Sequence, residues 1–139
     1  NIYRILEDIP YGYFDVVICN LVLCIVPESE VLAILKNTYG TLAPAGRAYI
    51  GFCNPKIYDV QESQLDFRFP SGARYEDNHD YKKIKKEGSY EIIESHRPVE
   101  WYEKAFQKAG LKLLATHFTP EYELHGQKIK DFIVFELSK

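Results

Sequence analysis

Methionine is absent from the 139 residues, and the chain opens at Asn1. Because a complete gene product normally starts with methionine, we expect Asn1 to be internal to a longer protein; a processed natural N-terminus is the alternative. The sequence also lacks an apolar run of about 20 residues, the length that a membrane-spanning helix requires. It shows no secretory signal pattern near its start. From these absences we expect no membrane partner.

An excess of positive charge is absent too. Lysine and arginine total 17 against 20 aspartate and glutamate residues, which gives a net charge of −3 and a pI of about 5.8. Nucleic-acid-binding surfaces are usually basic, so we expect no nucleic-acid partner. Hydrophobic residues make up 46% of the chain and charged residues 27%, a composition typical of one folded domain with its own core.

Cysteine is scarce, with only Cys19, Cys24 and Cys53 present. An odd number without regular spacing argues against a disulfide framework. All three lie in or beside apolar segments, which favours buried, reduced thiols in a cytoplasmic protein. His117 and His125 show no metal-ligand spacing with any cysteine, and we expect no metal site.

The first third of the chain predicts a parallel β-α-β unit. Residues 14–19 form a continuous apolar run rich in β-branched side chains, as in a strand covered on both faces. Pro27 and the acidic residues after it favour the first turn of a helix, and Gly40 favours its end. A Pro/Gly turn then leads into a second buried strand, 47–53. This order implies a right-handed crossover and a parallel sheet.

The middle of the chain lacks such a pattern. Residues 54–88 are polar with scattered aromatic side chains, and we expect an irregular lid or binding loop there. The run 82–86 holds four lysines among acidic neighbours, which favours a solvent-exposed face over a phosphate contact. The remaining expected elements are a strand at 90–93, a helix at 98–109 stopped by Gly110, a strand at 111–118, a hairpin-like turn at 120–127 and a final strand at 130–137.

Four motifs, in this order along the chain, resemble class I S-adenosylmethionine-dependent methyltransferases. Leu6–Pro10 is similar to the loop before the family's fourth strand, and Phe14–Val17 to the opening of that strand. Leu42–Arg47 resembles the Leu-x-Pro-Gly-Gly-x turn before the fifth strand. His96–Leu111 resembles the later helix and the start of the strand after it. An unrelated Rossmann-like domain is the alternative.

The resemblance implies an α/β fold with a partial Rossmann-like sheet, in which parallel strands are followed by an antiparallel C-terminal strand. It implies that residues 1–139 are the C-terminal portion of a single methyltransferase domain, that 54–95 is a substrate-lid-like insertion and that the N-terminal half is missing. The family's Gly-rich cofactor loop has no counterpart in the sequence. Ala45 stands where the family's turn has glycine, and Ile5 stands where an adenine-binding acid is common.

By the same resemblance, the turn after the first strand lies against the methionine part of S-adenosylmethionine. This turn comprises Cys19, Asn20, Leu21 and Val22. Ligands of open α/β sheets bind beyond the carboxyl ends of the strands, and the amide of Asn20 can donate or accept a hydrogen bond there. The alternative is a turn-forming asparagine with apolar neighbours in the core.

Candidate substrate contacts stand at the same edge and around the lid. Cys53 and Asn54 end the second strand, Tyr75 lies within the lid segment, and Arg97 and Trp101 flank the start of the later helix. An arginine can clamp an acidic substrate through two parallel hydrogen bonds. Each position also has an ordinary structural interpretation, such as a strand end, a helix-start arginine or a tryptophan packed in the core.

Candidate catalytic residues follow from the chemistry of methyl transfer. The reaction is an in-line displacement that needs positioning and sometimes a base that takes a proton from the acceptor. His79 and His96 are suited to that role near neutral pH, and Arg97 is the third candidate. Plain surface histidines and an arginine near a helix start are the alternatives.

We therefore expect an enzyme that transfers a methyl group from S-adenosylmethionine to a small-molecule acceptor, as part of a longer chain. Without the Gly-rich loop, the chain alone is expected to bind S-adenosylmethionine weakly or not at all and to be inactive. The rival hypothesis is a non-catalytic fragment whose exposed sheet surface favours a homodimer or a swapped assembly. A third is a subunit that completes a partner carrying the Gly-rich half.

Overall fold

The computed structural model describes residues 9–57, 65–85 and 91–139. In these ranges the helices are α2 (Glu28–Thr41) and α3 (Val99–Ala109), with a 3-10 turn η1 (Pro55–Ile57). The strands are β1 (Phe14–Asn20), β2 (Leu42–Cys53), β3 (Leu65–Arg68), β4 (His79–Lys85), β5 (Glu91–His96), β6 (Lys112–Phe118), β7 (Tyr122–Leu124), β8 (Gln127–Ile129) and β9 (Phe132–Ser138). Ile5 and most of the Leu6–Pro10 motif lie outside the described residues.

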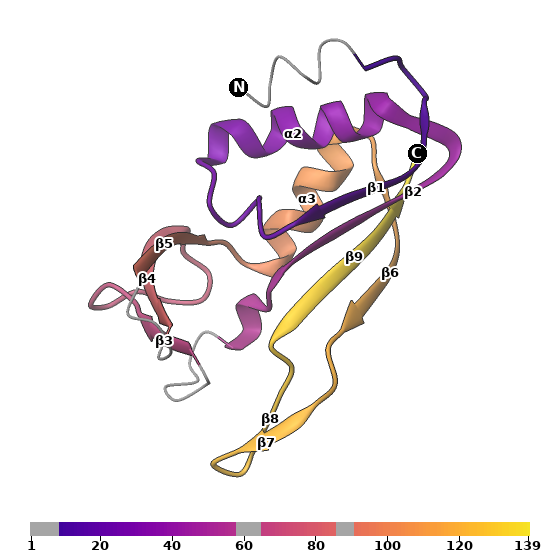
Figure 1. Ribbon diagram of the computed structural model, residues 1–139. Coiled ribbons are helices and arrows are strands. Elements are labelled where there is room, and N and C mark those ends of the chain that lie inside the picture. Colours follow the sequence, from indigo (N-terminus) through magenta and orange to yellow (C-terminus); the bar gives the residue numbers. More distant parts are fainter. Residues whose placement is uncertain (1–8, 58–64, 86–90) are drawn as a thin grey trace.

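The main sheet has the strand order β1-β2-β9-β6. β1 and β2 run parallel, with Val17 opposite Ala48, whereas β9 is antiparallel to both β2 and β6. The two helices α2 and α3 contact each other and cover one face of this sheet, and the hydrophobic core lies between them and the strands (Figure 1). This arrangement confirms the predicted mixed α/β fold with a parallel β-α-β unit and an antiparallel C-terminal strand.

Helix α2 turns an apolar stripe toward the sheet, on which Val31 and Leu35, one turn apart, are completely buried. The helix extends to Thr41, one residue beyond its predicted end at Gly40. Gly40 is buried, and a Cβ there would lie 3.1 Å from the ring of Tyr11. The glycine therefore permits close packing rather than ending the helix.

The Pro/Gly turn expected before the second strand is part of β2, where the register against β1 shifts between Phe14 and Val16. Neither Ala45 nor Gly46 has a positive φ, so alanine fits this turn without backbone strain. Gly46 is needed for space, because a Cβ there would lie 2.8 Å from the carbonyl oxygen of Phe14.

β3, β4 and β5 form a separate antiparallel sheet, called the second sheet below. The irregular segment predicted at 54–88 is therefore wrong at 65–68 and 79–85, where strands stand, whereas 69–78 has no helix or strand. Residues 58–64 and 86–90 lie outside the described residues. Tyr81 and Lys83 point inward and are buried, whereas Lys82 between them is exposed. The exposed lysine face predicted for this run is wrong at Lys83, because alternate residues of a strand face opposite sides.

Helix α3 confirms its prediction closely. Pro98 is its N-cap residue, and Gly110 ends it in the left-handed conformation, with φ 87°. The amides of Gly110 and Leu111 donate to the carbonyls of Gln107 and Phe106, which satisfies the last turn. The predicted hairpin-like turn is a short β7–β8 hairpin that extends away from the main sheet (Figure 1).

Candidate functional site

The carboxyl ends of β1 and β2 meet the second sheet at one end of the molecule (Figure 1). Residues 21–27, called the β1–α2 loop below, lie against the end of β5, where the amide of Ser95 donates to the carbonyl of Cys24 at 2.6 Å. A hollow of about 530 Å3 opens beside this junction. A second, small cavity of about 20 Å3 lies between the second sheet and the end of β2.

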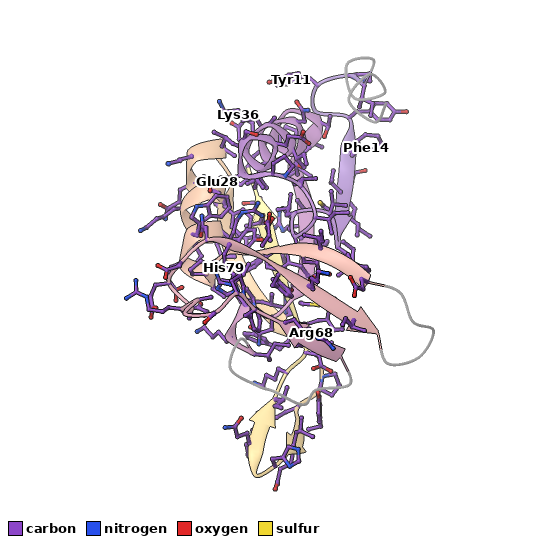
Figure 2. All side chains as sticks on the ribbon, turned by 90° about the vertical axis from the view of Figure 1, so that its left-hand side faces the viewer. Tyr11, Phe14, Glu28, Lys36, Arg68 and His79 are labelled. Atoms are coloured by element: carbon purple, nitrogen blue, oxygen red, sulfur yellow. The ribbon has the colours of Figure 1, made fainter. Side chains whose placement is uncertain are left out.

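The larger hollow has the size of a small-molecule site, which is typically about 300–1,000 Å3. Apolar side chains of the β1–α2 loop and of Ile93 form part of its wall, and Glu28, Asp80 and Ser95 add polar groups. His79, His96 and Arg97 also line it. Figure 2 views the molecule from this side, with Glu28 above His79. The structure thus brings the three predicted catalytic candidates to one place, and their catalytic role stays a prediction.

His79 and His96 are cross-strand neighbours on β4 and β5, and their rings stack with centroids 4.9 Å apart. Nδ1 of His79 lies 2.9 Å from the carbonyl oxygen of Asp77, and Nε2 of His96 lies 2.8 Å from that of Tyr75. Because a carbonyl oxygen only accepts, each of these nitrogens carries the proton in the neutral ring. Burial lowers the pKa of His96, which favours its neutral form.

The predicted cofactor turn stands at the carboxyl end of β1, as expected. Leu21 has a φ of 57°, which is uncommon for a non-glycine residue and is concentrated at ligand sites. Its amide donates to the carbonyl of Gly51 at 2.8 Å. The Asn20 side chain lies against Gly51, because a Cβ on Gly51 would be 2.9 Å from its Oδ1. Cys19 and Val22 flank these residues, and burial raises the pKa of the Cys19 thiol to about 11. Contact of this turn with a cofactor stays a prediction.

Arg97 is 3% exposed and is held by the β1–α2 loop. Its Nη1 donates to the carbonyl of Leu23 and its Nη2 to the carbonyl of Val26, both at 2.8 Å. The guanidinium also lies 5.1 Å from the ring centroid of Trp101. Both terminal nitrogens are thus engaged within the chain, and a substrate clamp by Arg97 stays a prediction.

Of the five predicted substrate contacts, only Arg97 lines the larger hollow. The hydroxyl of Tyr75 accepts from the amide of Val99 at 3.1 Å and donates to Glu100 at 3.0 Å. Since Pro98 makes no side-chain cap, Tyr75 caps the first turn of α3 from the segment between β3 and β4. Trp101 lines a different groove, between α2 and α3.

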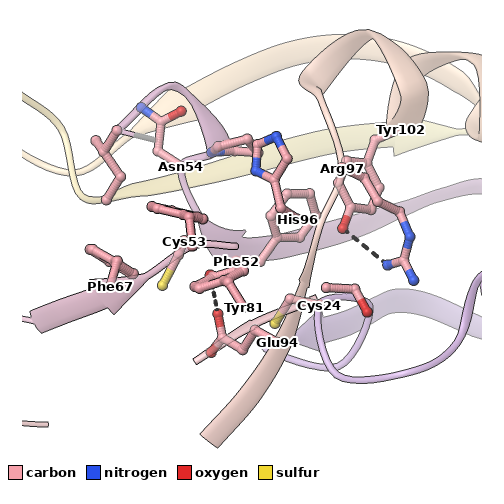
Figure 3. Close-up of a pocket in the computed structure, with 14 residues that line it drawn as sticks. Cys24, Phe52, Cys53, Asn54, Phe67, Tyr81, Glu94, His96, Arg97 and Tyr102 are labelled. Atoms are coloured by element: carbon pink, nitrogen blue, oxygen red, sulfur yellow. Dashed lines mark hydrogen bonds between the residues drawn. The ribbon is translucent and has the colours of Figure 1, made fainter. Parts of the chain in front are cut away.

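Cys53 and Asn54 line the small cavity instead (Figure 3). The side-chain amide of Asn54 donates to the carbonyl of Lys130, and its oxygen accepts from the amide of Lys56. These bonds fix the turn after β2. The cavity has room for about one water molecule, so in this conformation it does not hold a substrate.

A buried polar network borders the small cavity, and the sequence patterns did not reveal it. Nζ of Lys83 donates to Glu94 and to the sulfur of Cys53, at 2.9 Å each, and the hydroxyl of Tyr81 donates to Glu94 at 2.6 Å. Figure 3 shows the last bond. Burial by itself lowers the pKa of Lys83, and Cys53 and Glu94 more than offset it. The one sequence signal that could have revealed this network was the spacing of His79, Tyr81 and Lys83 at every second position.

Among the residues that the structure describes, no group of histidine, cysteine and acidic side chains could hold a metal ion. In the same part of the chain, neither helix is long and apolar enough to cross a membrane.

The comparisons with known proteins point to one fold. No protein-family model and no curated protein matches the sequence. Among solved structures, an S-adenosylmethionine-dependent methyltransferase from Mesorhizobium loti matches with a TM-score of 0.64 and 17% identity, over 94% of this chain and 64% of that one. One from Methanosarcina mazei matches with a TM-score of 0.62 and 19% identity, over 94% and 62%.

A third solved structure is the 1,6-didemethyltoxoflavin-N1-methyltransferase of Burkholderia thailandensis, with bound 1,6-didemethyltoxoflavin and S-adenosylhomocysteine. It matches with a TM-score of 0.61 and 12% identity, over 97% of this chain and 48% of that one. The chain thus spans between about half and two thirds of the length of these proteins. It has the fold of part of a class I S-adenosylmethionine-dependent methyltransferase.

Proposed function

We propose that this chain forms the acceptor side of an S-adenosylmethionine-dependent methyltransferase that acts on a small molecule, as part of a longer chain. The observation that carries the proposal is the hollow of about 530 Å3 beside the β1–α2 loop, with two stacked imidazoles in its wall. The Burkholderia protein, which shares the fold, binds a small acceptor and S-adenosylhomocysteine. Segment 54–95 is then the lid over the acceptor.

S-adenosylmethionine supplies an activated methyl group in this proposal. Asn20, Leu21 and Val22 lie against its methionine part, and the strained Leu21 and the amide of Asn20 fit a ligand-facing turn. Cys19 supports this turn from within β1. Because the sequence has no Gly-rich loop after a strand, this chain alone binds the cofactor weakly or not at all.

His79 is the proposed base. Its Nδ1 donates to the carbonyl of Asp77, so Nε2 is the basic nitrogen of the neutral ring. An acceptor hydroxyl or amine loses a proton when it is methylated, and an imidazole accepts it near neutral pH. The buried His96 packs against His79 and holds its ring in place.

The test uses the gene product at its native length, isolated from its native source, after its intact mass has been compared with 16.2 kDa. The protein is incubated with methyl-labelled S-adenosylmethionine and a small-molecule extract of the same cells. We expect label in a small-molecule product, and a rate lowered about 10²- to 10⁴-fold by His79→Gln. His117→Gln, an exposed β6 position, is the matched control. Methyl transfer that is unchanged in His79→Gln, or absent from wild-type protein, contradicts the proposal.

The compartment is proposed from the cysteines. Cys19, Cys24 and Cys53 are free thiols, and free thiols persist in reducing compartments. We therefore propose a cytoplasmic protein.

A second candidate function is a non-catalytic module that self-associates or completes a partner. Its support is an exposed apolar row along β1 and the β1–α2 loop, where Val16 is 54%, Ile18 73% and Ile25 54% exposed. β1 lies at the edge of the main sheet, and such edges pair with other strands. Sedimentation should then show concentration-dependent dimers that Ile18→Lys abolishes. A monomer across micromolar concentrations contradicts a homodimer.

A further inference from the structure

We propose that Arg97 is a positioning residue that couples the second sheet to the β1–α2 loop, so that the end of β5 and the predicted cofactor turn move as one unit. The coupling itself is a property of the chain. Only its consequence for cofactor binding rests on the proposed function.

The β1–α2 loop depends on donors from outside itself. The carbonyls of Leu23 and Val26 accept from Arg97, and the carbonyl of Cys24 between them accepts from the amide of Ser95. All these donors belong to residues 95–99, where β5 ends and α3 begins, called the β5–α3 junction below. Within the loop, the amide of Ile25 donates to the carbonyl of Val22 at 3.1 Å. The loop conformation, strained at Leu21, is therefore held from the junction.

The guanidinium of Arg97 suits this task and is fixed for it. Its planar fork reaches two carbonyls three residues apart, which a single ammonium cannot do with the same geometry. Hydrogen bonds from a charged donor are about twice as strong as neutral ones. The Trp101 ring 5.1 Å away and the Tyr102 hydroxyl at 3.5 Å hold the group from the side of α3.

The same junction is tied to the segment between β3 and β4, which contains Tyr75. His96, the residue before Arg97, donates from Nε2 to the carbonyl of Tyr75. The hydroxyl of Tyr75 accepts from the amide of Val99, two residues after Arg97. A change at Tyr75 therefore reaches the β1–α2 loop through Arg97, although the hydrogen bonds of Tyr75 described above go to His96, Val99 and Glu100.

The experiment measures amide hydrogen exchange, residue by residue, in the gene product at its native length without cofactor. In Arg97→Lys, the amides of Leu21 and Ile25 are expected to exchange about tenfold faster, since hydrogen bonds from a charged donor are lost. Amides of the β2–β9 ladder serve as the internal reference. Arg74→Lys is the matched control, because Arg74 is exposed and pairs only with Asp77 among the described residues. Unchanged exchange at Ile25 in a folded Arg97→Lys variant overturns the proposal.

Tyr75→Phe separates coupling from a merely local structural role. This variant removes one hydroxyl, and we expect faster exchange at Ile25 in the wild-type background. In the Arg97→Lys background the same change should add nothing, because the connection is already broken. Additive effects overturn the coupling. If Arg97→Lys fails to fold, Tyr75→Phe alone still decides, because an unchanged Ile25 amide contradicts the proposal.

The functional consequence is measured separately, in the gene product at native length. Arg97→Lys should raise the KM for S-adenosylmethionine more than it lowers kcat, since Arg97 positions the loop and does not touch the reacting atoms. A loss confined to kcat contradicts the positioning role. If the protein transfers no methyl group at all, the proposed function fails, and the exchange results still stand or fall by themselves.

Discussion

Lys83 and Glu94 form an ion pair within the second sheet, on the face that lies against the end of β2. Their Nζ and Oε1 atoms are 2.9 Å apart, and their side chains are only 11% and 4% exposed. The two residues come from neighbouring strands, β4 and β5, and both point inward. Removing one charge of such a pair leaves the other buried without compensation, whereas replacing both by apolar groups is often neutral.

Lys83→Met should therefore lower the free energy of unfolding by about 3–5 kcal/mol. The double variant Lys83→Met with Glu94→Leu should recover most of that loss, since no uncompensated carboxylate remains. Urea unfolding of the single and double variants measures both quantities. If the double variant is as unstable as the sum of its single changes, the ion pair is not the unit that the structure indicates.

Acid should weaken the fold through His96. Burial holds its pKa below the usual value of 6.5, so as the pH falls below about 6.5 the unfolded chain takes up a proton that the folded chain resists. The free energy of unfolding then decreases until the pH passes the folded-state pKa, and above 6.5 the site contributes nothing. His96→Gln should flatten this part of the pH profile, and His117→Gln should not. The check is urea unfolding across the acid range.

Gly110 combines a left-handed backbone with a close neighbour. Its φ is 87°, and a Cβ would lie 3.1 Å from the Tyr39 ring. Gly110→Ala should cost about 1–2 kcal/mol of stability for the backbone alone, and more for the contact. Gly72→Ala is the matched control, since its φ is 76° with nothing within 4 Å. Thermal unfolding of both variants compares them; equal losses would show that the Tyr39 contact contributes nothing.

The cysteines should react slowly in the folded protein. Burial raises the pKa of the Cys19 thiol to about 11. The pKa of Cys24 is raised to about 12, and burial is the largest cause. Burial also raises the pKa of Cys53, against the opposing effect of Lys83. Because the thiolate is the reactive form, alkylation at mildly alkaline pH should be slow until denaturant is added. A thiol that reacts in the native state as fast as a free peptide thiol contradicts this expectation.

Much of the main sheet was predictable because its signals are local. A β-branched run, a proline with acidic residues, and a glycine after α3 each act within a few residues of themselves. In the second sheet, β5 was predicted in part, as the strand at 90–93, whereas β3 and β4 were missed. The inward positions of β4 include a charged residue, Lys83. Polar side chains at buried positions hide the alternation that reveals a half-buried strand.

The candidate site was likewise predictable only in part. The position of Asn20, Leu21 and Val22 at the carboxyl end of β1 was predictable, because it follows from where the strand ends; their contact with a ligand stays a prediction. The stacking of His79 on His96 depends on the β4–β5 register, which no local pattern specifies. Arg97, predicted as a substrate clamp, binds carbonyls more than seventy positions away along the chain.

By itself, the sequence determined the β-α-β order, the direction of β1 and β2 and the helix boundaries to within one residue, because these depend on periodicity and capping within short windows. Only the tertiary structure decided which polar side chains are buried, since burial of a charge is tolerated only where a distant group compensates it. Lys83 and Glu94 compensate each other, and the β1–α2 loop carbonyls compensate Arg97. Hydrogen bonds and ion pairs between residues far apart in the sequence therefore decide which polar side chains are buried beside the candidate site.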